Sequence, residues 1–249
     1  MPRILVIDDD RNFRHLVTVA LRPAGHQVLE AGSARDAEAV LARERVDLLL
    51  IDGLLPDADG SRWISERRKT VGAPFIFVSA FWKAGRDARQ LHADVKPAGF
   101  LRKPATAEQI LGEVQKVLGK PAQCALSGAD LDELEAMRVE YTASIPRRLR
   151  EIRLGLEQVG RRTRDTVLFA ETRRHVHEVA GTAGSFGFEA LSEICAKIEQ
   201  ALVAWRSRSD DMTWAAVAVE ARALVRWEEH WRRGESLPGS PRRAASGLA

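Results

Sequence analysis

Residues 46–60 read VDLLLIDGLLPDADG, a nearly continuous apolar run that ends at Asp52 and is followed by a loop with one proline and two glycines. A short apolar run bounded in this way is typical of a strand buried on both faces of a parallel sheet. The carboxyl ends of such strands are where open α/β sheets bind their ligands. The stretch therefore predicts a central buried strand that carries an aspartate at its functional end.

Four similar apolar runs surround this strand and alternate with helical patterns. The expected strands are 3–7, 26–30, 46–51, 73–78 and 98–102. The expected helices are 11–22, 34–44, 60–69, 84–92 and 105–118. Five strand–helix units predict a doubly wound, flavodoxin-like α/β domain over residues 1–118, with a five-stranded parallel sheet covered by helices on both faces.

The pattern changes after residue 118. Residues 119–128 lack apolar periodicity and are predicted to be a linker, and residues 234–249 are predicted to be a disordered tail. Between them, residues 129–233 show helical periods only, so we expect an all-α helical bundle. Pro146 is expected either to start a helix in its first turn or to kink one. The expected helices are 130–143, 146–160, 165–184, 188–206 and 212–232.

Composition excludes some classes of function. The 249 residues are 45% hydrophobic and 29% charged, and the net charge of +3 comes from basic residues interleaved with acidic ones, which disfavours nucleic-acid binding. The two cysteines, Cys124 and Cys195, are far apart in the sequence and have no metal-ligand spacing. We therefore expect reduced thiols in a reducing compartment. No run approaches the ~18 apolar residues of a membrane span, and the N-terminus lacks signal-peptide features. A cytoplasmic location without membrane partners is therefore expected.

Polar side chains follow four of the five predicted strands. Asp8 and Asp9 follow the first, Asp52 the third, Ser79 the fourth and Lys103 the fifth. These ends meet at one edge of the sheet. Neighbouring carboxylates repel one another, so either one of them becomes protonated or a cation binds. An oxygen-only ligand set suits Mg²⁺. With a lysine opposite, the set predicts phosphoryl transfer to a carboxylate.

This pattern resembles a response-regulator receiver domain over residues 1–118. The loop 52–60 also has Pro56 and Gly60 at the family's positions, and Lys103 is followed by Pro104. The resemblance implies that Asp52 accepts a phosphoryl group from a sensor histidine kinase. It also implies that the domain catalyses its own phosphorylation and dephosphorylation, as in bacterial two-component signalling.

The resemblance further assigns the remaining site residues. Asp9, Asp52 and the backbone carbonyl of Leu54 would hold Mg²⁺, and Asp8 would act mainly through metal-bound water. Two residues, Ser79 and Lys103, would contact the phosphoryl oxygens. Phe100 would be the switch aromatic, and the Lys103–Pro104 bond is expected to be cis.

A second stretch, HEVAGTAGSFG at residues 177–187, places small residues after His177, although each glycine costs a helix interior about 1 kcal/mol relative to alanine. Helical spacing puts the core face on the opposite side of the helix, so His177 is expected to point to solvent. Gly181 and Gly184 would then leave room for a docking partner. His175, on the core side, is expected to be structural. The expected core face consists of Leu168, His175, Val179 and Phe186.

This stretch resembles the histidine phosphotransfer (HPt) family over residues 129–233. The resemblance implies that His177 is a phospho-acceptor that exchanges phosphoryl groups with another receiver-domain protein, in a direction left open. Exchange between Asp52 and His177 within one chain is a hypothesis. Only 72 residues follow His177, too few for a kinase ATP-binding domain.

Two alternatives stay open. The helical domain could be a docking module whose His177 is never phosphorylated, regulated by a receiver that changes conformation. A transcription factor is disfavoured because the helical region shows no helix-turn-helix with a basic recognition helix. The oligomeric state is not indicated.

Overall fold

The computed structural model of the chain describes residues 1–80, 96–119, 126–161, 165–208 and 210–235, and it divides into two units, Met1–Glu140 and Tyr141–Ala249. The first unit contains a five-stranded parallel sheet in the order β2-β1-β3-β4-β5. This is the doubly wound topology that the sequence predicts. The strands are β1 (Arg3–Ile7), β2 (Gln27–Ala31), β3 (Leu48–Asp52), β4 (Phe75–Ser79) and β5 (Gly99–Arg102).

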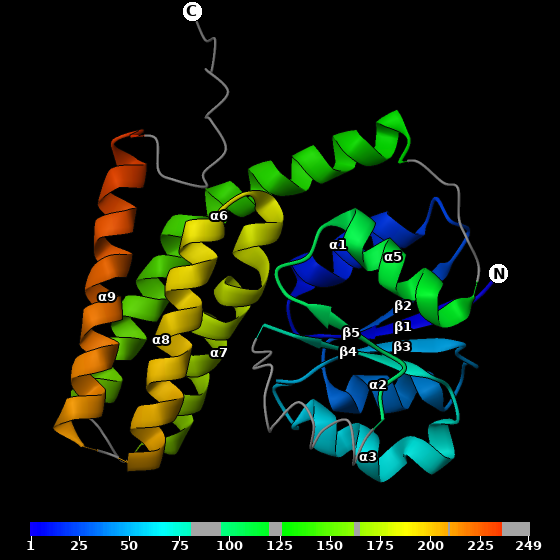
Figure 1. Cartoon of the computed structure of the whole chain (residues 1–249), viewed down its shortest axis with the longest axis horizontal. Coiled ribbons are helices and arrows are strands. Elements are labelled where there is room, and N and C mark those ends of the chain that lie inside the picture. The colour runs from blue at the N-terminus through cyan, green and yellow to red at the C-terminus, as the bar shows by residue number, and fades with distance from the viewer. Residues whose placement is uncertain (81–95, 120–125, 162–164, 209, 236–249) are drawn as a thin grey trace, which may run out of the picture. The chain divides into compact units, whose positions relative to one another are not determined.

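Helices cover both faces of this sheet. Figure 1 shows α1 and α5 on one face and α2 and α3 on the other. Each helix begins at a residue whose side-chain oxygen accepts a backbone N–H of the first turn, as N-caps do. The helix predicted over 84–92 lies outside the described residues. The helices are α1 (Arg11–Leu21), α2 (Ala34–Leu41), α3 (Gly60–Val71) and α5 (Ala107–Leu118).

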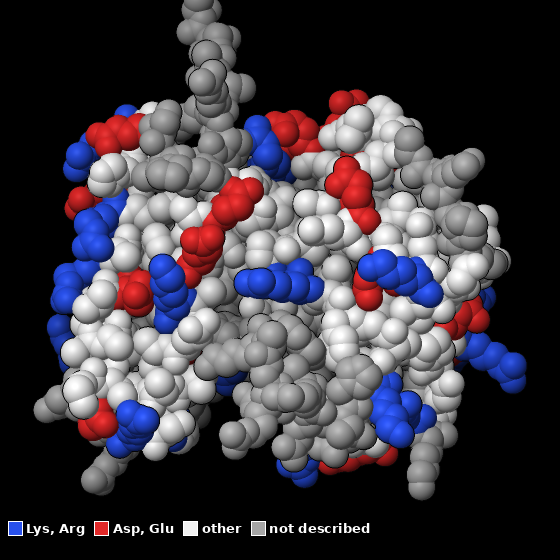
Figure 2. Space-filling model, viewed as in Figure 1, with Lys and Arg blue, Asp and Glu red and all other residues white. Residues whose placement is uncertain are grey.

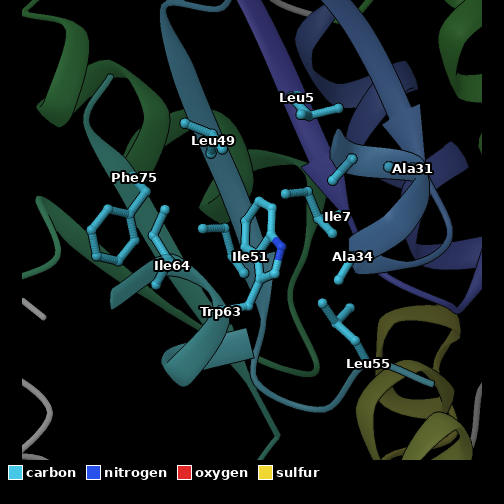
Figure 3. Packing of buried hydrophobic residues seen from close by; sticks show 11 residues of the cluster. Leu5, Ile7, Ala31, Ala34, Leu49, Ile51, Leu55, Trp63, Ile64 and Phe75 are labelled. Carbon is cyan, nitrogen blue, oxygen red and sulfur yellow. The ribbon is translucent and has the colours of Figure 1, made fainter. Parts of the chain in front are cut away.

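A buried cluster joins the sheet to α2 and α3. Figure 3 shows Trp63 of α3 packed beside Ile51 of β3, with Ile7 of β1 close by. Every residue of β3 is buried. The first four residues of β3 are apolar, as a strand covered on both faces requires. Its only polar residue, Asp52, lies at the carboxyl end of the strand, where the sheet opens to ligands.

The helical region begins with one long helix, α6 (Gly128–Arg161), which starts in the first unit and continues into the second. The two helices predicted over 130–143 and 146–160 are therefore one, and Pro146 lies inside it. Proline removes one helical hydrogen bond. Packing compensates, because a buried stripe continues on both sides of the proline. This stripe consists of Tyr141, Ile145, Leu149 and Ile152.

The second unit is an all-helical bundle, as predicted. After α6 come α7 (Thr166–Thr182), a 3₁₀ turn η1 (Ala183–Phe186), α8 (Glu189–Arg208) and α9 (Asp211–Arg232). Aromatic rings fill its interior: Tyr141 stacks on Phe186 with ring centroids 4.8 Å apart, and Trp205 lies 4.9 Å from Trp214. Among the described residues, no helix is both long and apolar enough to cross a membrane.

Candidate functional site

The sheet brings the predicted acidic residues and lysine together. Asp8 and Asp9 follow β1, Asp52 ends β3, and Lys103 follows β5. The Lys103 ammonium lies 2.5 Å from Asp8 Oδ2 and 2.5 Å from Asp52 Oδ2. One carboxylate oxygen from each of Asp8, Asp9 and Asp52 lies within 4.8 Å of the other two. Oxygen ligands in such a group fit a hard divalent cation.

Burial makes the charges in this site interact strongly. Asp8, Asp52 and Lys103 are all nearly inaccessible to water. Burial raises the pKa of Asp8 well above its usual value; Lys103 opposes that rise and Asp52 adds to it. Burial alone would lower the pKa of Lys103, but the carboxylates of Asp52 and Asp8 hold it above its usual value. The ammonium also lies 4.3 Å from the ring centroid of Phe13, a cation–π contact.

The loop after β3 is folded tightly against the end of that strand. The Leu54 N–H donates to Asp52 Oδ1 at 3.0 Å, and the Gly60 N–H donates to the Gly53 carbonyl at 3.1 Å. Leu54 also pairs with Asp59 in an isolated β-bridge. A Cβ atom added at Gly60 would lie 1.9 Å from the Asp52 carbonyl oxygen. Only glycine therefore fits at residue 60, where the start of α3 lies directly against the Asp52 carbonyl.

Ser79 lies at the same edge of the sheet, whereas Phe100 lies within β5. Ser79 is the last residue of β4, and a Cβ added at Gly53 would lie 4.0 Å from its Oγ, so its hydroxyl lies near the loop after Asp52. Phe100 lies half-buried in β5, and its N–H donates to Glu113 Oε1 at 3.3 Å. The Lys103–Pro104 peptide bond is cis, which confirms that expectation. The switch role of Phe100 stays a prediction.

Sequence reasoning missed Arg14, which braces the acidic loop. Its Nη1 donates to the backbone carbonyls of Asp8 at 2.6 Å and Asp9 at 3.1 Å, while its Nε pairs with Glu30 at 3.0 Å. These contacts hold the backbone that carries the two acidic side chains. The sequence shows only that Arg14 lies about one turn into α1. That position does not predict its contact with Glu30 of β2.

In the second unit, the expectation that His177 points to solvent was wrong. The side chain is 4% exposed, and its Nδ1 lies 2.9 Å from Glu199 Oε2 on α8. Glu199 is itself buried, and its Oε1 accepts from Arg173 Nε at 3.1 Å. Sequence reasoning missed Glu199, because it lies 22 residues after His177 on a different helix.

The small residues after His177 explain why this side of α7 is covered. The Ser192 hydroxyl of α8 donates to the Ala180 carbonyl at 2.5 Å, and Ala180 and Gly181 are both buried. A helix face without bulky side chains therefore receives α8 closely. On the opposite side, Val179 and Phe186 are buried as predicted, whereas Leu168 and His175 are only half-buried.

Comparison with known protein families supports the resemblance stated for each part of the chain. Residues 4–115 match the model of the response regulator receiver domain, and residues 136–233 match that of the Hpt domain. The chain therefore carries a receiver domain and an Hpt domain, a combination that indicates two-component phosphorelay signalling.

Individual relatives match over part of their length. The phosphate regulon transcriptional regulatory protein PhoB of Pseudomonas aeruginosa is 30% identical over 118 residues, which are 46% of this chain and 51% of that protein. The transcriptional regulatory protein PhoP of Escherichia coli K12 is 31% identical over 123 residues, 47% and 52% of the two chains. The chain thus spans about half the length of these relatives. The chemotaxis response regulator CheY4 of Vibrio cholerae is 26% identical with a TM-score of 0.43, over 47% of this chain and 98% of that chain.

Proposed function

We propose that this protein is a phosphorelay intermediate with two acceptor residues, Asp52 and His177. Asp52 accepts a phosphoryl group from the phosphohistidine of a partner kinase. His177 exchanges phosphoryl groups with a receiver aspartate. The observation that carries the proposal is the buried cluster at the sheet edge, in which Lys103 bridges Asp8 and Asp52 beside Asp9.

The cluster supports transfer to a carboxylate. Asp9, Asp52 and the Leu54 carbonyl would hold Mg²⁺, with Asp8 acting through bound water. When bound, the cation would offset negative charge on the phosphoryl oxygens. An Asp52 oxygen forms the new O–P bond while the donor N–P bond breaks, and that electron pair returns to the donor imidazole.

The residues opposite the carboxylates then stabilise the product. Lys103, which pairs with Asp52 Oδ2 in the unphosphorylated site, would shift its contact to a phosphoryl oxygen. The Ser79 hydroxyl would donate to a second phosphoryl oxygen. Both residues are buried, so their interactions with a charged group are weakly screened by solvent.

The helical site supports a specific nitrogen as the second acceptor. With Nδ1–H donated to Glu199, the lone pair of His177 is on Nε2, which is the atom that would accept the phosphoryl group. Glu199 would also stabilise positive charge on the ring during transfer. Because the ring is buried, transfer requires that it become accessible to the partner carboxylate.

The proposal is tested by following label from phosphorylated donors. A panel of labelled histidine kinases and free receivers is mixed with the full chain and Mg²⁺, using wild type, Asp52→Ala and His177→Gln. His175→Gln is the matched control, since His175 lies two residues away on the same helix. Acid-labile, base-stable label that survives Asp52→Ala and His175→Gln but disappears in His177→Gln supports transfer through His177.

A second candidate is favoured by the burial of His177 and its contact with Glu199. In this alternative, phosphorylation of Asp52 regulates a helical domain that only docks a partner. Label confined to Asp52 across the donor panel, together with normal downstream signalling by His177→Gln, would support the docking function and contradict the relay.

A further inference from the structure

Asp57, in the loop between β3 and α3, binds the first turn of α2 with both carboxylate oxygens. Its Oδ1 accepts the Ala34 N–H at 2.9 Å, and its Oδ2 accepts the Arg35 N–H at 3.0 Å. These are the first two residues of α2, whose N–H groups have no partner within the helix. The next N–H, that of Asp36, is accepted at 3.0 Å by the N-cap, Ser33. The first turn of α2 is therefore capped jointly by its own N-cap and by Asp57 from the loop between β3 and α3.

The same loop is held on two other sides. Leu55 is buried in the cluster that also contains Ala34, and Figure 3 shows these two side chains next to each other at one end of the cluster. Asp59 caps α3 by accepting the Arg62 N–H at 3.0 Å. Leu54 lies between these anchors and the acceptor aspartate. The position of its backbone carbonyl therefore depends on how firmly the loop is fixed.

We propose that Asp57 is a positioning residue for the cation site: its bidentate contact with α2 fixes the loop so that the Leu54 carbonyl is aimed into the acidic cluster. This inference rests on the proposed function, in which that carbonyl is a Mg²⁺ ligand. Asp57 itself is exposed and does not join the cluster of Asp8, Asp9 and Asp52.

The chemistry of the contact suits this role. A carboxylate at a helix N-terminus is favoured by the helix dipole and by two N–H donors, so it holds better than a neutral side chain would. A carbonyl ligand carries no full charge to draw a cation, so its contribution depends on being already in place. Magnesium demands near-ideal ligand geometry, which makes its affinity sensitive to loop position.

Coupling of this kind is reciprocal. If the α2 contact favours the cation, then the cation must favour the α2 contact. Mg²⁺ binding should therefore slow hydrogen exchange of the Ala34 and Arg35 amides, although both lie outside the site. A purely structural helix cap would show no such response to the cation.

The experiment compares three full-length proteins: wild type, Asp57→Ala and Ser33→Ala. The Ser33 variant is the matched control, because it removes a cap from the same helix turn without touching the loop. Mg²⁺ is titrated while the Gly53 and Leu54 amide resonances are followed, and amide exchange at residues 34 and 35 is measured with and without the cation. We expect Asp57→Ala to weaken Mg²⁺ binding about three- to tenfold, a change of the size of one lost cap, and Ser33→Ala to leave it unchanged.

The outcomes separate this inference from the function beneath it. Asp57→Asn, which keeps one acceptor oxygen, should recover part of the affinity. Equal Mg²⁺ affinity in wild type and Asp57→Ala, with no cation-dependent protection at Ala34, would overturn the positioning role while leaving the Mg²⁺ site intact. A wild-type protein that binds no Mg²⁺ at Asp52 would instead refute the proposed cation site itself.

Discussion

Lys103 balances the charge of the acidic site. Its ammonium contacts two buried carboxylates, and its side chain is 2% exposed. We expect Lys103→Met to lower the free energy of unfolding of the first unit by about 3–5 kcal/mol in the absence of divalent cations, because removing one partner leaves buried charge unpaired. Mg²⁺ should recover more stability in this variant than in wild type, since the ammonium no longer occupies Asp52 Oδ2. Urea unfolding with EDTA and with Mg²⁺ measures both effects.

Lys116→Met is the control for this prediction. Lys116 pairs with Glu113 on α5, but its side chain is 75% exposed, so its loss should change stability by less than about 0.5 kcal/mol. Equal stabilisation of wild type and Lys103→Met by Mg²⁺ would mean that the lysine and the cation do not share the carboxylates.

His175 makes the stability of the second unit depend on pH. Partial burial lowers the pKa of its ring below the ordinary value of about 6.5. Between the lowered and the ordinary pKa the unfolded chain binds more protons, so this contribution to stability is present above about pH 6.5 and is lost as the pH falls through the folded-state value. We expect wild type to lose more stability than His175→Gln between about pH 7.5 and 5. Urea unfolding followed by tryptophan fluorescence checks this; a constant difference between the two proteins at every pH would contradict it.

The residues that sequence could and could not identify differ in a physical way. Asp52 and Lys103 were predictable because the end of a buried strand fixes where a side chain lies. Glu199 and Asp57 act through contacts with elements more than 20 residues away in the chain, and no local period encodes such contacts. Arg14 contacts the backbone of Asp8 across the turn between β1 and α1, a contact that helical periodicity does not encode either. The prediction that His177 points to solvent was wrong for the same reason. The helix α7 is covered on two sides, whereas the apolar pattern indicates only one buried side.

At the scale of elements, the loop between β3 and α3 is the most constrained segment of the site. Gly60→Ala would place a methyl group 1.9 Å from the Asp52 carbonyl oxygen, a backbone atom that cannot move without displacing Asp52. We expect this variant to lose at least about 2 kcal/mol of stability and most of its Mg²⁺ affinity. Thermal unfolding and a Mg²⁺ titration measure the two losses.

Gly112→Ala is the matched glycine control. A Cβ atom added at Gly112, inside α5, meets nothing within 4 Å. Alanine should therefore stabilise α5 by up to about 1 kcal/mol through helix propensity and leave cation binding unchanged. A Gly60→Ala protein with normal Mg²⁺ affinity would show that the loop can shift without moving the site.

Element boundaries follow from sequence where one force dominates. The five strands were predicted to within a few residues, most directly β3 and β4, which are buried along their whole length and apolar up to their last residue. The single helix α6 was not, because Pro146 marks a local break while the buried side chains on both sides of it maintain one helix. Tertiary packing outweighs the local preference there.

At the scale of the whole chain, the charge distribution does not indicate a binding surface of one sign. On the face drawn in Figure 2, basic and acidic side chains are interspersed, as the near-neutral composition predicts. Many of the charged side chains pair within a single helix, as Arg147 does with Glu151 and Arg232 with Glu228. The fold class of each domain was predictable because each has its own hydrophobic periodicity. Phosphoryl exchange between Asp52 and His177 depends on contacts between the domains, which hydrophobic periodicity does not predict.

The last prediction concerns that exchange. Residues 119–127 lie between α5 and α6. Where a short flexible connection tethers two groups, their effective concentration is of the order of millimolar. If Asp52 and His177 are competent partners, transfer between them in wild type should be first order and independent of protein concentration. Chains are labelled at Asp52, the donor is removed, and the appearance of base-stable label is followed before and after tenfold dilution from about 10 μM.

A mixture of two variants supplies the control for this experiment. In Asp52→Ala plus labelled His177→Gln, label can move only between chains. The fraction of label transferred per unit time should therefore fall about tenfold on tenfold dilution and lie far below that of wild type at about 10 μM. A wild-type rate that falls with dilution in the same way would show that the tether contributes nothing and that exchange is intermolecular. Label that never leaves Asp52, in a protein whose His177 accepts phosphoryl groups from other receivers, would mean that the two acceptors serve different partners.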